Sequence, residues 1–147
     1  LSRNELILTT YKVSVHIHSR STHCKWLTEI YHDNPGWMNP ETAAKLGLKN
    51  GDEIQVTSPL DAITTKVRVT PSVAPNVLAI SFHLGRTESG RYASGKATPL
   101  AVGSDPDLKN KWWDTYGVNP NWLVPNGVDP VNGQMIWMDT VVQVEKV

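Results

Sequence analysis

The chain has 147 residues, which is enough for one compact domain with a hydrophobic core. Its 14 Lys and Arg residues balance 14 Asp and Glu residues, so it lacks the excess positive charge that draws proteins to nucleic acid or anionic membranes. No apolar run approaches the ~20 residues that cross a bilayer. We therefore expect one domain with no nucleic-acid partner and no direct membrane insertion.

Alternating apolar and polar residues predict a mainly β fold. Residues 5–10 read as an apolar first strand, and residues 12–18 continue it with Val13, Val15 and Ile17 on one face. Further strands are predicted at residues 53–58, 62–70, 77–83 and 135–147. In the last of these, one face would hold Ile136, Met138, Thr140, Val142 and Val144.

Two short helices interrupt the strands. Residues 39–47 begin with Asn39 as N-cap, Pro40 at the first helical position and Glu41 in the first turn, and end at Gly47 as a left-handed stop. A second helix is predicted at residues 25–31, with Thr22 available as its cap. Its apolar side chains would share one side: Trp26, Leu27, Ile30 and Tyr31.

A long irregular segment is predicted between residues 99 and 133, where five Pro and four Gly residues interrupt any regular pattern. It nevertheless contains Trp112, Trp113 and Trp122. Indole rings favour burial of roughly 150–250 Å² each, and long irregular segments in compact domains are usually functional or packed on a partner. We infer that a packing partner for this segment lies outside the chain.

Common enzyme motifs are absent from the sequence, including the phosphate-binding P-loop, the His-Glu-x-x-His zinc motif and the Cys-x-x-Cys pair. His16 and His18 would share a strand face and could chelate zinc, but no third ligand follows at a recognisable spacing. Cys24, the single cysteine, could act as a nucleophile beside His23, although neighbouring side chains on an extended segment point apart. No catalytic residue and no metal ligand is assigned in this chain.

Three segments read in order resemble a known family. They are residues 6–12, residues 16–22 with Trp26 and Leu27, and residues 38–56, and the third is the most specific. There an Asn-Pro-x-x-Ala helix runs into Leu-Gly-x-x-x-Gly-Asp and a strand. Over essentially its whole length the chain resembles the C-terminal molybdopterin-dinucleotide-binding domain of the dimethyl-sulfoxide-reductase family. Residues 90–95 and the tail are most similar to the polysulfide, thiosulfate and tetrathionate reductase branch.

The resemblance implies a double-psi β-barrel with short helices and a long irregular C-terminal segment. Residues 1–147 would be one domain of a larger molybdenum or tungsten oxidoreductase subunit, binding bis(molybdopterin guanine dinucleotide) and inactive alone. The metal ligand would lie in an earlier domain. Its partners would be the preceding domains of the same subunit and an Fe–S electron-transfer subunit. The resemblance leaves the substrate, the metal and the cellular compartment open.

The resemblance also implies which residues touch the cofactor. The loop after the first strand would place Ser19, Arg20 and Ser21 near the pterin and phosphates, with His18 as a hydrogen-bond partner of the pterin. Without the resemblance, this loop would read as a solvated surface connection.

Three further residues belong to the implied site. Asn39 and Glu41 would lie near a nucleotide end of the cofactor. Asn121, favoured slightly over Asn119, would supply an amide to the pterin. The alternative for both asparagines is turn formation around Pro120.

Two other functions remain as alternatives. A free-standing double-psi barrel could act as a protein-interaction or substrate-recognition module, with the tryptophans as its contact patch. An independent small enzyme would need Ser, His and Cys residues to converge. A parent gene that encodes a long preceding segment with a Cys-rich Fe–S motif would favour the cofactor-binding domain over both.

Overall fold

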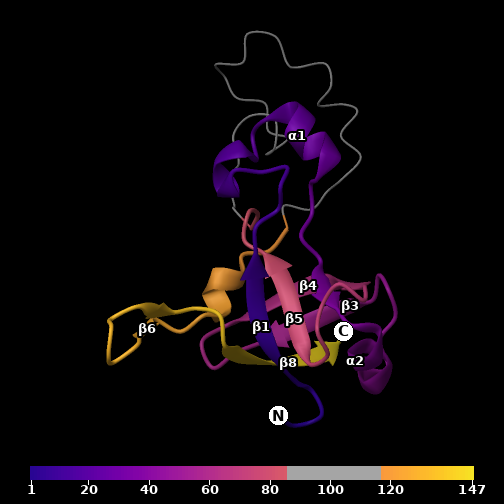
Figure 1. Ribbon diagram of the computed structural model, residues 1–147. Coiled ribbons are helices and arrows are strands. Elements are labelled where there is room, and N and C mark those ends of the chain that lie inside the picture. The colour runs from indigo at the N-terminus through magenta and orange to yellow at the C-terminus, as the bar shows by residue number, and fades with distance from the viewer. Residues whose placement is uncertain (86–116) are drawn as a thin grey trace.

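The computed structural model describes residues 1–85 and 117–147, and its centre is a closed six-stranded barrel (Figure 1). The barrel strands are β1 (Glu5–Tyr11), β2 (Gly36–Met38), β3 (Glu53–Thr57), β4 (Ala62–Val69), β5 (Val77–Ser81) and β8 (Thr140–Lys146). They close in the order β1-β5-β2-β4-β3-β8. The prediction of a mainly β barrel with short helices is confirmed.

The barrel has an internal two-fold pattern. β1 is parallel to β5 and β2 is parallel to β4, whereas all other neighbours in the ring are antiparallel. Exchanging β1 with β4, β2 with β5 and β3 with β8 preserves the order of the ring and the direction of every pair. Two interleaved halves of three strands therefore build the barrel, and this is the double-psi topology that the resemblance implied.

Alternation along the strands fills the barrel interior, because successive side chains of a strand point to opposite faces. Leu6 and Leu8 of β1 are buried, as are Val142 and Val144 of β8, whereas the residues between them are more exposed. The core consists of Leu6, Leu8, Met38, Ala43, Leu48, Ile54, Val56, Ile63, Val67, Leu78, Ile80, Leu123, Val142 and Val144.

Helix α2 (Pro40–Leu46) has the predicted ends. The side chain of Asn39 accepts a hydrogen bond from the N–H of Glu41, and Gly47 is left-handed with φ of 72°. Helix α1 (Lys25–Ile30) lies where a helix was predicted, but Cys24 and not Thr22 occupies its N-cap position. Thr22 donates instead to the carbonyl of Ser19, so the predicted cap is wrong.

The predicted apolar side of α1 does not face the described core. Trp26 and Ile30 are 77% and 67% exposed.

Two strand predictions are wrong in extent. β1 ends at Tyr11, and the predicted strand over 12–18 is absent. The Ile17 N–H bonds to the Ser21 side chain, and this bond turns the chain into the 3₁₀ helix η1 (His18–Ser21).

The predicted strand over 135–147 is divided into β7 (Met135–Ile136) and β8. Ile136 and Met138 are exposed and do not share the buried face of Val142. The three-residue β2 was not predicted, since it is too short to show alternation.

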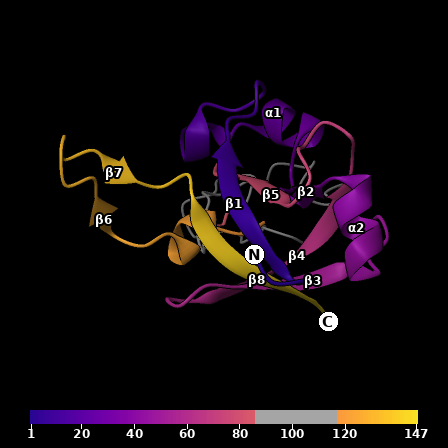
Figure 2. The same ribbon diagram turned by 60° about the horizontal axis from the view of Figure 1, so that its bottom comes forward.

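Different connecting segments lie at the two ends of the barrel. The segment 12–35, with η1 and α1, lies beyond the end of β1, and α2 lies at the other end (Figures 1 and 2). β6 (Gly127–Val128) pairs with β7, and this hairpin stands off from the barrel. Within the predicted irregular segment, the short 3₁₀ helix η3 (Pro120–Leu123) is described, whereas Trp112, Trp113 and residues 90–95 lie outside the described residues. No helix in the described parts is long and apolar enough to cross a membrane.

Candidate functional site

The strand directions place the predicted loop at one end of the barrel. β1 and β5 run in parallel and finish at this end, and β2, antiparallel to β5, begins there. The segment that carries η1 leaves from the end of β1 and returns to the start of β2. Asn34 lies in this segment and donates to the carbonyls of Ser81, at the carboxyl end of β5, and of Val118. Residues 117–118 therefore also lie at this end of the barrel.

His16 is buried and anchors the loop. Its Nε2 lies 2.6 Å from the carbonyl oxygen of Tyr31, so this nitrogen carries the proton and donates. Its Nδ1 then accepts from the hydroxyl of Ser21, 3.0 Å away, while that hydroxyl oxygen accepts the N–H of Ile17 at 2.9 Å. Ser21, which is 5% exposed, therefore joins the two ends of the loop.

A second buried histidine stacks on the first. The rings of His16 and His83 are 4.8 Å apart at 18°, and Nδ1 of His83 lies 2.8 Å from the hydroxyl of Ser81. Burial, with a smaller contribution from His16, lowers the pKa of His83 to about 4, so its ring is neutral at pH 7. Its Nε2 is buried and has no hydrogen-bond partner among the residues that the structure describes.

The outer face of the loop presents polar groups. His18 is exposed, its backbone is left-handed with φ of 50°, and its ring stacks on Phe82 at 4.9 Å. A left-handed conformation costs a residue with a Cβ roughly 1–2 kcal/mol, and such strain clusters at binding sites. Arg20 is exposed and Ser19 is partly buried. An imidazole, a guanidinium and a hydroxyl thus lie within three consecutive residues.

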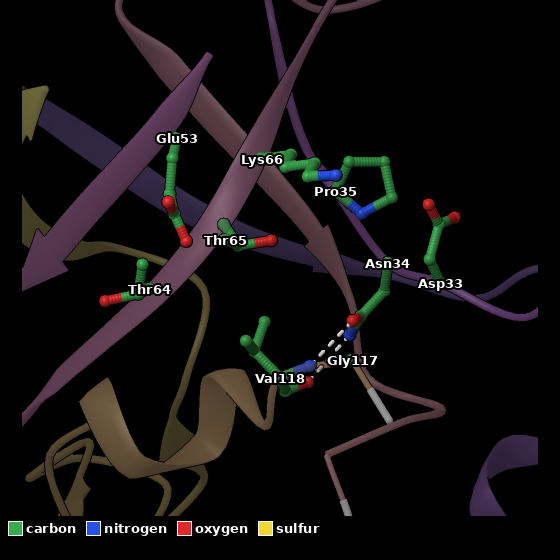
Figure 3. Close-up of a pocket in the computed structure, with 9 residues that line it drawn as sticks. All are labelled: Asp33, Asn34, Pro35, Glu53, Thr64, Thr65, Lys66, Gly117 and Val118. Carbon is green, nitrogen blue, oxygen red and sulfur yellow. Dashed lines mark hydrogen bonds between the residues drawn. The ribbon is translucent and has the colours of Figure 1, made fainter. Parts of the chain in front are cut away.

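Asn34 links the carboxyl end of β5 to Val118 through hydrogen bonds. It is 1% exposed, and its Nδ2 donates to the carbonyls of Ser81 and Val118, both at 2.7 Å. Its Oδ1 accepts the N–H of Val118 at 2.8 Å (Figure 3). Gly117 leaves the space for this amide, because a Cβ there would lie 2.3 Å from Oδ1.

A pocket of about 240 Å³ with a mixed polar and apolar lining opens beside this amide (Figure 3). Asp33, Glu53, Lys66 and two threonines supply its polar lining. A second pocket of about 200 Å³ is lined by residues that include Gly117, Val118, Asn119 and Trp122. None of the seven predicted site residues lines either pocket.

Asn121 is exposed in η3, between Asn119 and Trp122, which both line the second pocket. Its N–H donates to Oδ1 of Asn119 at 3.1 Å, so Asn119 forms the turn that was weighed as the alternative to cofactor binding. The contact of Asn121 with a pterin stays a prediction.

Asn39 and Glu41 lie at the other end of the barrel from η1. Both ends of the Asn39 amide are used: Oδ1 caps α2, and Nδ2 donates to the carbonyl of Val73 at 2.8 Å. Glu41 is exposed in the first turn of that helix. The structure does not bring these two residues to the loop, and their contact with a nucleotide stays a prediction.

Sequence reasoning missed the buried side of the site. The alternation over residues 12–18 predicts that His16 shares a strand face with His18, but its two ring nitrogens bond to Tyr31 and Ser21. His83 and Asn34 received no role, because neither stands in a motif and only the fold brings them beside His16 and Val118. Among the described residues, no group of three or more His, Cys, Asp or Glu side chains is placed to hold a metal ion.

A family model described as "Molydopterin dinucleotide binding domain" matches residues 6–139. The chain belongs to this family. A thiosulfate reductase molybdopterin-containing subunit from Salmonella typhimurium is 27% identical over 133 residues, which cover 90% of this chain and 15% of that protein. An arsenate respiratory reductase molybdopterin-containing subunit from a Shewanella species is 35% identical over 113 residues, which cover 70% of this chain and 13% of that protein.

Among solved structures, acetylene hydratase from Pelobacter acetylenicus is similar, with a TM-score of 0.68 and 18% identity over 97% of this chain and 18% of that one. At this identity the likeness shows the fold alone. The family match confirms the cofactor class that the sequence analysis named, a molybdopterin dinucleotide. The chain itself spans only about a seventh of the curated relatives that it matches.

Proposed function

We propose that residues 1–147 are one domain of a larger molybdenum oxidoreductase subunit and hold its bis(molybdopterin guanine dinucleotide) cofactor. The observation that carries this proposal is the family match over residues 6–139, combined with molybdopterin-containing reductase subunits as relatives. When bound, the cofactor supplies two-electron redox chemistry at its metal. The metal ligand would come from another domain, and an Fe–S subunit would carry the electrons.

The part of this chain in that function is to bind and orient. His18, Ser19 and Arg20 offer hydrogen-bond donors to pterin and phosphate oxygens, and Arg20 brings the positive charge that a pyrophosphate attracts. The donors fit the group, because the exposed guanidinium and imidazole lie on a loop whose base is fixed by the bonds of His16 and Ser21. The buried Nε2 of His83 adds a polar atom that the described residues leave without a partner.

Ser21 has a different part from its neighbours in this proposal. Its hydroxyl already donates to His16 and accepts from Ile17, so it positions the loop. Asn121 would contact the pterin from η3. Asn39 and Glu41 would reach a nucleotide only at the other end of the barrel.

The test replaces Arg20 and Ser19 by alanine in the parent subunit. Each lost charge-assisted hydrogen bond costs about 1.5–3 kcal/mol, so the double variant should retain markedly less molybdenum and guanine nucleotide per subunit after dialysis. The matched control is Arg3→Ala, an exposed arginine that bonds to the carbonyl of Lys45 away from the loop. Metal analysis, nucleotide release and thermal unfolding are measured on all three proteins. Full cofactor retention by the double variant would contradict the assignment of the loop.

A further inference from the structure

The β6–β7 hairpin exposes a concentration of apolar side chains. We name residues 127–139 the hairpin arm. Its exposed apolar residues are Val128, Val131, Met135, Ile136, Trp137 and Met138, with exposed fractions from 42% to 91%. Among the described residues, β6 and β7 pair only with each other, Gly127 opposite Ile136 and Val128 opposite Met135. The arm extends away from the barrel (Figure 2).

Local hydrogen bonds define the turn of the arm, but its apolar side chains remain exposed in the described structure. Its turn is closed by the Asp129 carboxylate, which accepts the N–H groups of Val131 at 2.9 Å and Asn132 at 3.0 Å. Met138 connects its base to the barrel, since the hydroxyl of Thr10 lies 4.0 Å from the Met138 sulfur. An isolated two-stranded hairpin is marginally stable in water, and contiguous exposed apolar surface marks a contact site.

The charge of the arm favours an apolar partner. Residues 117–139 contain no Lys or Arg and only two acidic residues, Asp129 and Asp139. Asp129 is engaged in the turn, and those hydrogen bonds lower its pKa. The arm therefore has no cationic group for a nucleic acid or an acidic protein, and its exposed side chains favour apolar contact.

We propose that the hairpin arm docks onto an apolar surface of the part of the same polypeptide that lies outside residues 1–147. This inference rests on the proposed function, because the matched segments make up only 15% and 13% of the curated relatives. In a subunit of that kind, most of the chain lies outside residues 1–147. A covalently linked partner has an effective concentration that a separate protein does not reach, so a small arm suffices for stable contact.

Methionine oxidation tests the docking without any substitution. The chain has three methionines: Met135 and Met138 on the arm are 51% and 43% exposed, whereas Met38 in the core is 0% exposed. The cofactor-loaded parent subunit is treated with dilute hydrogen peroxide, and sulfoxide is quantified peptide by peptide. The denatured subunit gives the rate of a fully exposed methionine, and Met38 gives the rate of a buried one.

If the arm docks, Met135 and Met138 oxidise roughly tenfold or more slowly than in the denatured subunit. Protection that persists through a roughly 100-fold dilution places the partner in the same polypeptide. Oxidation of both residues at the denatured rate, with Met38 still protected, overturns the docking. Protection that disappears on dilution also overturns it, because the partner would then be a second copy or a separate subunit.

A pair of variants provides the second test. Ile136→Glu places a charge on the arm and should raise the oxidation rate of Met135 and Met138 in the parent subunit. Leu60→Glu is the control, since Leu60 is 59% exposed in the turn between β3 and β4, and it should leave both rates unchanged. Unchanged protection in Ile136→Glu overturns the docking.

The cofactor content of the same samples separates this inference from the proposed function. A loaded subunit with exposed arm methionines contradicts the docking and leaves the cofactor assignment intact. A subunit that never binds molybdenum and guanine nucleotide contradicts the proposed function, and its methionine protection still decides whether the arm docks.

Discussion

The hydroxyl of Ser21 and Nδ1 of His16 lie 3.0 Å apart, and this hydrogen bond closes the loop that connects β1 to α1. Nε2 of His16 faces a carbonyl oxygen that can only accept, so Nε2 carries the proton of the neutral imidazole. In that tautomer Nδ1 accepts and the Ser21 hydroxyl donates. A cofactor contact by Ser21 would have to use the one lone pair that its oxygen still has.

Ser21→Ala should destabilise the chain. It leaves Nδ1 of His16 and the N–H of Ile17 without their partner, and an unsatisfied buried polar group costs about 1–3 kcal/mol. Urea unfolding measures the loss of free energy. Ser14→Ala, at an exposed position of the same segment, should change stability by less than about 0.5 kcal/mol. Equal losses in both variants would mean that the bond contributes nothing.

Gly117→Ala should be more damaging than Gly133→Ala. Both glycines have positive φ, 65° and 72°, so both substitutions carry the same backbone strain. A Cβ at position 117 would also lie 2.3 Å from Oδ1 of Asn34, whereas nothing lies within 4 Å of one at position 133. We expect about 1–3 kcal/mol of additional destabilisation at position 117 by thermal or urea unfolding. Similar losses at the two positions would show that the Asn34 amide yields without cost.

Asn34→Leu should weaken the attachment of residues 117–118 to the end of β5. The change removes three hydrogen bonds, to Ser81 and twice to Val118, and leaves buried backbone groups unsatisfied. Hydrogen exchange should accelerate at the Val118 amide more than at Val56 in the barrel core. Asn126→Leu, at an exposed position, is the control and should leave the exchange at Val118 unchanged.

The fold could be predicted where sequence patterns are local. Period-2 alternation located β4 and β8, and the Asn39, Pro40 and Gly47 signals gave both ends of α2. β2 could not be predicted, because three residues show no period and their pairing with β4 and β5 depends on the closed ring. The extra strand over 12–18 was predicted because its alternation is real, but a side-chain bond from Ser21 bends the chain.

The candidate site divides in the same way. The loop at His18 could be proposed from its family motif, since its outer residues are consecutive in the sequence. The buried residues beneath this loop could not be predicted, because His16, His83 and Asn34 act through contacts between segments that are distant along the chain. An alternating pattern assigns polar residues to the solvent-exposed face of a strand. His16 is 1% exposed, and only the tertiary structure shows this.

Stability should fall as the pH drops from about 7 to 5, and His83 should be a main cause. Burial, and then the neighbouring His16, lower the pKa of His83 from 6.5 to about 4 in the folded chain. Between these values the unfolded chain binds a proton that the folded chain excludes, so the contribution is complete above pH 6.5 and is lost toward pH 4. The expected loss by pH 5 is about 2 kcal/mol.

The pH range keeps the carboxyl groups with lowered pKa values out of the measurement. The carboxyl groups of Glu5, Asp52 and Asp129 have lowered pKa values, so they remain ionised in the folded chain between pH 5 and 7. Among the described residues, the ionisable side chains in ring contact with His83 are His16 and Tyr31, which stay in place in the variant. His83→Gln should therefore flatten the dependence of the unfolding free energy on pH over this range, whereas His23→Gln, at an exposed position, should leave the His83 contribution in place. A wild-type slope in His83→Gln would show that the buried ring is not the group that links proton binding to folding.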